Sequence, residues 1–222
     1  MAMVYVSIGI WGIILFFFPL ILARRSFELY TKMRKVYLDT IRALAAAIDA
    51  KDPYTKGHSE RVAEISVGLA QELNLPGRDI ENIEYTALLH DIGKIGIDDR
   101  ILGKETSLTS QEFDRIKEHP AIGANIIEPV DFLKNSYEAI YHHHERYNGK
   151  GYPDGIKSKD IPILARIIAV ADAYDAMGSD RPYRKKLDKD KILKELKDQS
   201  DKQFDPEVVK ALISILDRER KE

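Results

Sequence analysis

The chain has 222 residues, of which 44% are hydrophobic and 32% are charged, so it is long enough for one domain with a smaller addition and is not globally disordered. Its formal net charge of −2 gives no overall basic surface, so a nucleic-acid polymer is not expected as a partner. The absence of cysteine excludes disulfide bonds, zinc fingers and cysteine-held iron–sulfur clusters.

Residues 3–23 carry no charged side chain and have the length that crosses the hydrocarbon core of a bilayer. Arg24 and Arg25 follow directly, and no Lys or Arg precedes the segment. The positive-inside rule therefore predicts a single-pass anchor in the inner (cytoplasmic) membrane within residues 1–23, with the rest of the chain in the cytoplasm. A signal peptide is the alternative, but a basic start and a small-residue cleavage site are not evident.

Residues 24–40 are predicted to continue as a helical stalk. From the stalk to about Ala50, apolar or aromatic side chains recur at steps of three and four residues. The series, interrupted by Arg34, consists of Tyr30, Tyr37, Ile41, Leu44 and Ile48. This spacing is typical of a coiled-coil seam, so a homodimer through the stalk is one expectation. The alternative is that the last three of these residues pack on the core of the following domain.

The remainder of the chain has helical periodicity almost throughout. Predicted helices cover residues 58–73, 78–92, 135–146, 163–178, 188–198 and 206–217; a further helix opens with a capping box at Thr109 and Glu112, and another begins at His119. Glycine and proline dominate the stretch NGKGYPDG, which must be a loop. No strand is convincing, so the fold class is predicted to be all-α.

All six histidines lie between residues 58 and 144; they are His58, His90, His119, His142, His143 and His144. Imidazole with carboxylate and no thiol describes a hydrolytic metal centre better than a structural one. Asp172 lies in an apolar helix, where a carboxylate needs a cation or hydrogen-bond donors, and an ion pair with Arg166 or Arg181 is the plain alternative. Each signal is weak alone, but together they indicate one metal site.

Several ordered segments resemble the HD-GYP domain, a branch of the HD phosphohydrolase superfamily. They read AAAIDAKDPYTKGHSERV, LLHDIGK, KEHPAIGANII, HHERYNGKGYP and ADAYDAMGSDRPYR. The resemblance covers about residues 36–218 and implies an HD-domain helical bundle.

The resemblance also implies a set of metal ligands, with Asp91 as the bridge between two ions. The implied ligands are His58, His90, Asp91, His119, His143, His144 and Asp172, and His142 is expected to be an exposed neighbour. Tyr54 stands where members with a third metal carry glutamate, so two divalent ions are expected, most readily iron or manganese.

The activity that the resemblance implies is hydrolysis of cyclic di-GMP to pGpG, GMP or both. Asp91 and Lys94 are the expected catalytic residues. Substrate contacts are expected from Lys94, Gly151, Tyr152, Pro153, Arg181 and Arg184. The plain alternative for Lys94 is a surface lysine. For Arg181 and Arg184 it is a solvated basic loop, and for residues 151–153 it is a simple turn. Two other functions stay open: hydrolysis of another nucleotide such as cyclic GMP-AMP, and a catalytically silent cyclic di-GMP receptor.

Overall fold

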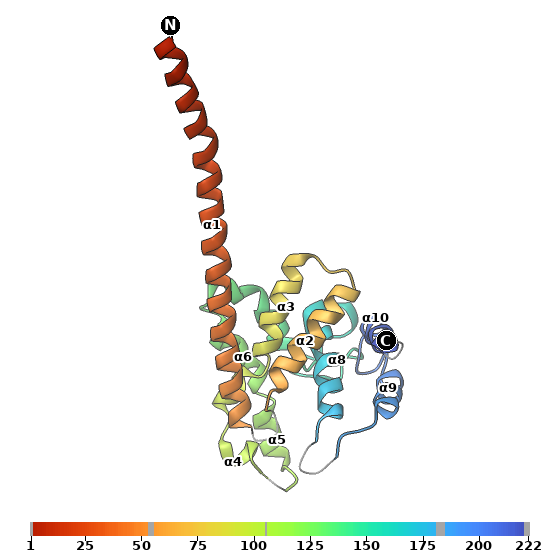
Figure 1. Cartoon of the computed structure of the whole chain (residues 1–222). Coiled ribbons are helices and arrows are strands. Elements are labelled where there is room, and N and C mark those ends of the chain that lie inside the picture. Colours follow the sequence, from red (N-terminus) through yellow and green to blue (C-terminus); the bar gives the residue numbers. More distant parts are fainter. Residues whose placement is uncertain (1, 53–55, 105, 181–184, 220–222) are drawn as a thin grey trace. The chain divides into compact units, whose positions relative to one another are not determined.

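The computed structural model describes the backbone of residues 2–52, 56–104, 106–180 and 185–219 (Figure 1). The side chains of residues 1–10, 13 and 14 also lie outside the description. Two compact units are present, Met1–Thr40 and Ile41–Glu222. The predicted metal ligands all belong to the second unit.

The described residues form helices and no regular strand, which confirms the predicted all-α fold class. The α-helices are α1 (Ala2–Lys51), α2 (His58–Glu72), α3 (Gly77–Leu89), α4 (Asp99–Leu102), α5 (Ser110–Ile116), α6 (His119–Ile127), α7 (Tyr137–His142), α8 (Ile163–Gly178), α9 (Lys189–Asp198) and α10 (Pro206–Glu219). Three short 3-10 helices accompany them: η1 (Ile92–Gly96), η2 (Asp131–Ser136) and η3 (Ser158–Asp160).

Two predicted helices are shorter than their periodicity indicated. The helix predicted over 78–92 ends at Leu89, and the chain continues from Ile92 as the 3-10 helix η1. The helix predicted over 135–146 is divided into η2 and α7, which ends at His142. The predicted capping box at the start of α5 is present, with both Thr109 and Glu112 making their reciprocal hydrogen bonds.

Within the described part of the chain, no helix is long and apolar enough to cross a membrane. The predicted anchor over residues 3–23 falls in large part on residues whose side chains lie outside the description. Further along α1, Ile41 and Ile48 are buried with 3% and 7% exposure, whereas Leu44 is 48% exposed. Ile41 and Ile48 therefore pack on the domain core, as the alternative to a coiled-coil seam predicts for them, whereas Leu44 does not.

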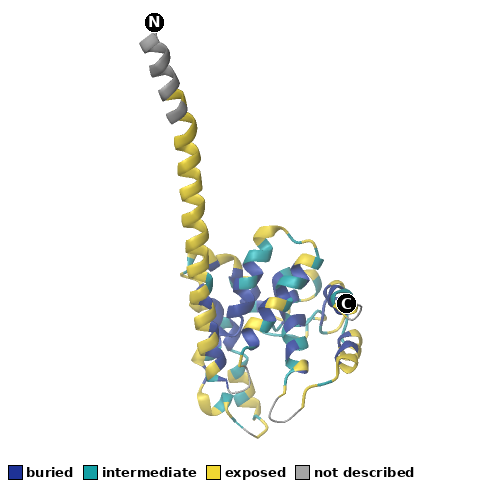
Figure 2. Ribbon diagram, in the orientation of Figure 1, coloured by how far each residue is buried: buried dark blue, intermediate teal, exposed yellow. Residues whose placement is uncertain are grey.

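The core of the second unit is built around α2, α3 and α8. Helix α2 packs against both α3 and α8, and Figure 2 shows buried residues along all three. Helix α8 is apolar nearly all round, and Ile167, Ile168 and Val170 have no exposed surface. A helix of this kind is stable only when it is surrounded by other elements. A carboxylate on α8 is consequently carried deep into the domain.

Close packing of η1 on α6 depends on glycine. A Cβ atom added to Gly93 would lie 1.9 Å from the carbonyl oxygen of His119 and 2.6 Å from the amide nitrogen of Gly123. Only glycine permits this approach of two backbones. The contact places the chain that follows His90 and Asp91 directly beside the start of α6.

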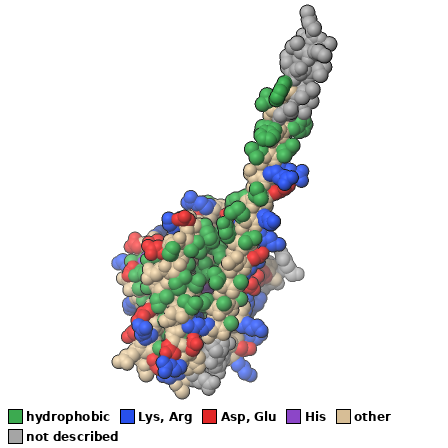
Figure 3. Space-filling view, turned by 90° about the vertical axis from the view of Figure 1, so that its left-hand side faces the viewer, with side chains coloured by type: hydrophobic (Ala, Val, Ile, Leu, Met, Phe, Trp, Pro, Cys, Tyr) green, Lys and Arg blue, Asp and Glu red, His purple; other side chains and the backbone are tan. Residues whose placement is uncertain are grey.

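The surface of the protein carries mixed charge. On the face shown in Figure 3, acidic and basic side chains are interspersed, and neither sign forms a continuous patch there. This face offers no basic track for a polyanion.

Candidate metal centre

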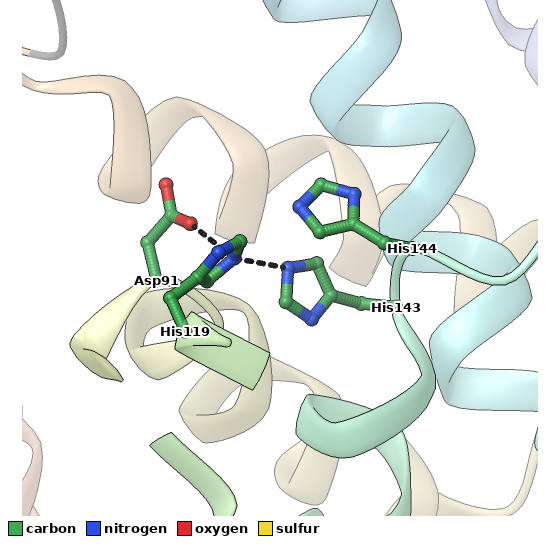
Figure 4. Close-up of side chains that lie close together, drawn as sticks. All are labelled: Asp91, His119, His143 and His144. Atoms are coloured by element: carbon green, nitrogen blue, oxygen red, sulfur yellow. Dashed lines mark hydrogen bonds and ion pairs between the residues drawn. The ribbon is translucent and has the colours of Figure 1, made fainter. Parts of the chain in front are cut away.

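Four potential ligands from three segments meet beside the end of α3. Asp91, His119, His143 and His144 offer ligand atoms that all lie within 4.8 Å of one another (Figure 4). His119 Nε2 lies 3.3 Å from Asp91 Oδ1 and 3.2 Å from His143 Nε2. Asp91 follows α3, His119 begins α6, and the adjacent His143 and His144 follow α7.

Three further ligand-type residues form a second group. His58 at the start of α2, His90 just after α3 and Asp172 in α8 also offer ligand atoms within 4.8 Å of one another. His58 Nε2 lies 3.4 Å from Asp172 Oδ1. Asp91 faces this group as well, because its Oδ2 lies 3.4 Å from His90 Nε2 while its Oδ1 faces His119. The Asp91 carboxylate therefore lies between the two groups, and all seven predicted ligands are brought together.

Hydrogen bonds to the outer nitrogen orient three of the histidine rings. The Nδ1 atoms of His90, His119 and His143 lie 2.7, 2.7 and 2.6 Å from the carbonyl oxygens of Ala87, Ile116 and Ile140, each three residues earlier. A carbonyl can only accept, so each Nδ1 donates, and in the neutral imidazole that a metal binds the lone pair is on Nε2. In all three histidines, Nε2 is thus the nitrogen available to a metal.

His58 is oriented by the carboxylate of Asp175, a residue for which no role was predicted. Asp175 Oδ2 lies 2.7 Å from His58 Nδ1, and the guanidinium of Arg61 donates to both Asp175 oxygens, at 2.6 and 3.0 Å. Asp175 comes three residues after Asp172, so both carboxylates lie on one face of α8. Two carboxylates three residues apart inside an apolar helix were the feature of the sequence that could have identified Asp175 as part of the site.

The donor set suits a divalent cation. His90 Nε2 is buried without a hydrogen-bond partner among the described residues, which is costly unless a ligand satisfies it. Burial and then the neighbouring His144 and His119 hold the pKa of His143 well below its usual value, and burial with His119 lowers the pKa of His144 to about 3. Both imidazoles are therefore neutral at pH 7, with lone pairs free for coordination.

The two carboxylates of the site are anionic. Burial by itself would raise the pKa of Asp91, but the positive charge of Lys94, with His90 and His119 beside the carboxylate, holds it well below its usual range. Burial likewise opposes ionisation of Asp172, and the hydrogen bond and charge of His58 outweigh it, so its pKa is lowered. Nitrogen and oxygen donors with two negative charges match iron, manganese or zinc and do not choose among them.

Lys94 lies inside the site. Its Nζ is 2.8 Å from Asp91 Oδ2 and 3.0 Å from Asp52 Oδ2, and only 14% of its side chain is exposed. Burial lowers the pKa of this ammonium, but the charges of Asp91 and Asp52 outweigh burial and raise it above its usual value. Lys94 is therefore a fixed cation beside the predicted ligands, and the alternative of a plain surface lysine is wrong.

The predicted GYP loop lies against the histidine pair. The Tyr152 ring centre is 4.9 Å from that of His144, and a Cβ on Gly151 would lie 2.2 Å from the amide nitrogen of Arg146. The absence of a side chain at Gly151 thus permits the tight approach that the sequence predicted. Pro153 is exposed next to Tyr152. Arg181, Arg184 and Tyr54, which carried the predictions on phosphate binding and ion number, lie outside the described residues.

The expectation for His142 was wrong, and so was the Arg166 half of the alternative for Asp172, whereas its Arg181 half lies outside the described residues. His142 is not exposed: it has 8% exposure, and its Nε2 lies 3.1 Å from Asp154 Oδ2, outside both ligand groups. The alternative ion pair between Asp172 and Arg166 is also absent, because Arg166 binds the Asp205 carboxylate and the Ile161 carbonyl oxygen. Asp172 is consequently directed to His58.

Comparisons with known proteins identify the family. Residues 42–208 match the family model described as the HD domain. A cyclic di-GMP phosphodiesterase of Thermotoga maritima is 37% identical over 88% of this chain and 54% of its own length. A 3'3'-cGAMP-specific phosphodiesterase of Vibrio cholerae is also 37% identical, over 79% of this chain and 38% of its own.

A solved structure supports the fold. The crystal structure of a cyclic GMP-AMP specific phosphodiesterase of V. cholerae superposes with a TM-score of 0.65 at 19% identity, covering 82% of this chain and 49% of the other. The chain spans about half the length, or less, of the relatives that it matches. The family match alone covers most of the chain. The chain therefore belongs to the HD domain family, as its resemblance to the HD-GYP branch predicts.

Proposed function

We propose that the chain hydrolyses a phosphodiester bond of a cyclic dinucleotide with the help of two divalent metal ions. The observation that carries this proposal is the position of Asp91, whose two oxygens face two separate groups of buried and half-buried ligands. His58, His90 and Asp172 would hold one ion and His119, His143 and His144 the other, with Asp91 shared. Iron or manganese is the expected metal.

The geometry suits attack of water on a phosphodiester. Paired divalent ions supply acidity for water and positive charge for phosphate oxygens. Lys94 adds a fixed ammonium at the same place, where negative charge gathers on the phosphate during the reaction. Tyr152 presents an aromatic ring next to His144, suited to a base or a phosphate oxygen. Arg181 and Arg184 are proposed to grip the remaining phosphate charge.

Cyclic di-GMP is the proposed substrate and pGpG, GMP or both the product. Support comes from the GYP loop beside the ligands and from the substrate named for the T. maritima relative. The V. cholerae relative of equal identity is named for 3'3'-cGAMP, which keeps that dinucleotide as the second candidate. A silent receptor is disfavoured because the complete ligand set is assembled.

The test is turnover by protein loaded with Mn²⁺ or Fe²⁺ under anaerobic conditions, with cyclic di-GMP and 3'3'-cGAMP compared by chromatography of the products. We expect Asp91→Asn to reduce hydrolysis to background, because one of the two ions loses its shared anionic ligand. Glu128→Gln, on an exposed residue, is the matched control. Protein that holds two metals per chain and cleaves neither dinucleotide would refute the proposal.

We further propose that residues 3–23 attach the chain to a membrane and that α1 pairs with a second copy. The support is the uncharged sequence of this segment and the exposure of its described apolar side chains, such as Phe16, Leu20 and Leu22. Tyr30 and Met33 are also exposed on α1. Their apolar surface is available to a partner helix.

A further inference from the structure

Glu145 is a buried carboxylate that directly follows the ligand pair His143 and His144. Its residue exposure is 3%. Its Oε1 accepts hydrogen bonds from the backbone amides of Asp154 and Gly155, both at 2.8 Å. A buried carboxylate is stable only when such donors compensate its lost hydration. The side chain therefore joins the end of the GYP loop to the segment that carries two metal ligands.

The loop is closed onto the ligand segment at three further points. The amide of Tyr152 donates to the carbonyl oxygen of His144 at 3.3 Å. The backbone of Gly151 lies against Glu145, since an added Cβ would come within 2.5 Å of the Glu145 Cα. The Asp154 carboxylate lies 3.1 Å from His142 Nε2. Residues 151–155 thus fold back over residues 142–146.

We infer that Glu145 is a positioning residue that holds Tyr152 against His144 by fixing the far end of this loop. The inference rests on the proposed function in one respect, namely that Tyr152 contacts the dinucleotide. Among the described residues, the Tyr152 ring is tied to the site through its own backbone bond and its ring contact with His144, so its place depends on where the loop returns. Glu145 fixes the position of Asp154 and Gly155, where the loop returns, through two hydrogen bonds to its Oε1.

Position and charge can be separated at this residue. In Glu145→Gln, an amide oxygen of the same reach can accept the same two hydrogen bonds, and the new amide group replaces Oε2, which has no partner among the described residues. In Glu145→Asp, the charge is kept but the carboxylate is withdrawn by about 1.5 Å, one carbon–carbon bond. Two bonds of 2.8 Å would then be stretched past the normal limit.

The experiment uses the full chain loaded with Mn²⁺. Trypsin cleavage after Lys150, an exposed residue inside the loop, is followed by mass spectrometry, and metal content and KM are measured alongside. We expect Glu145→Asp to speed cleavage at Lys150 and to raise KM, each by about tenfold, with two metals retained. Glu145→Gln should stay within about twofold of the wild type in both.

Three results would overturn the inference. One is a rate of cleavage at Lys150 in Glu145→Asp that equals the rate in the wild type. Another is a loss in Glu145→Gln as large as in Glu145→Asp, which would show that holding the position of the side chain is not sufficient and that its charge is needed as well. A third is metal loss in Glu145→Asp while the loop stays closed. If the wild type hydrolyses no dinucleotide, the proposed function fails, while the Lys150 cleavage rates still decide the role of Glu145.

Discussion

At the scale of single residues, the ligands could be predicted and their supports could not. His58, His90 and His119 stand in short segments whose order identifies the family, so their positions follow from the sequence. Asp175 and Glu145 act through contacts with His58 and with the loop amides. Those contacts join residues 117 and 9 positions apart, and only the fold shows which buried carboxylate faces which ring or amide.

Asp175→Asn is expected to weaken metal binding at the group formed by His58, His90 and Asp172 by about 10- to 100-fold, the usual effect of losing a partner behind a ligand. Asparagine can still accept from His58 Nδ1, but it removes the charge that orients the ring and binds Arg61. Competition with a chelator during a Mn²⁺ titration measures the affinity. Asp217→Asn on the exposed face of α10 is the control, and equal affinities in the two variants would contradict the expectation.

At the scale of elements, periodicity located the helices but not the ends that matter for the site. The pattern through LLHDIGK continues the apolar spacing of α3, yet α3 stops at Leu89. Adjacent side chains in an α-helix diverge by about 100°. Leaving the helix lets the neighbouring His90 and Asp91 both face the ligand groups. The apolar pattern does not reveal where α3 ends, because Ile92 remains buried in η1, which packs against α6 at Gly93.

Removal of residues 1–24 is expected to release the protein from membranes without loss of hydrolysis. The second compact unit starts at Ile41, so the shortened chain keeps the part of α1 that packs on the core. Co-sedimentation with vesicles of anionic and neutral phospholipid compares the two lengths, and turnover is measured on both. Full-length protein that stays in the supernatant would exclude the proposed anchor.

At the scale of the whole molecule, the buried charges predict how stability depends on pH before metal is added. Burial, with His119, lowers the folded-state pKa of His144 to about 3, whereas an unfolded histidine titrates near 6.5. Its contribution is complete above pH 6.5 and is lost as the pH falls toward 3. For His58, burial lowers the pKa, but Asp172 and Asp175 raise it to about 10. Its contribution is complete below pH 6.5 and is lost toward pH 10.

The metal-free protein should therefore be most stable near pH 6.5 and lose stability on both sides. Urea unfolding at pH 4, 6.5 and 9 in the presence of a chelator measures this. His144→Gln should flatten the acid side, because the substituted side chain has no proton to gain. An unfolding free energy that keeps rising between pH 6.5 and pH 4 would contradict the assignment.

The ligands also have a consequence for how this chain holds its shape. His58 and Asp172 are 114 positions apart in the sequence (172 minus 58), and the seven ligands lie in, or directly after, five helices. A cation bound by His58, His90 and Asp172 would tie these distant segments together and remove freedom from the unfolded chain, as a cross-link does. In a protein without a single cysteine, a bound metal ion would act as the cross-link that a disulfide bond provides elsewhere.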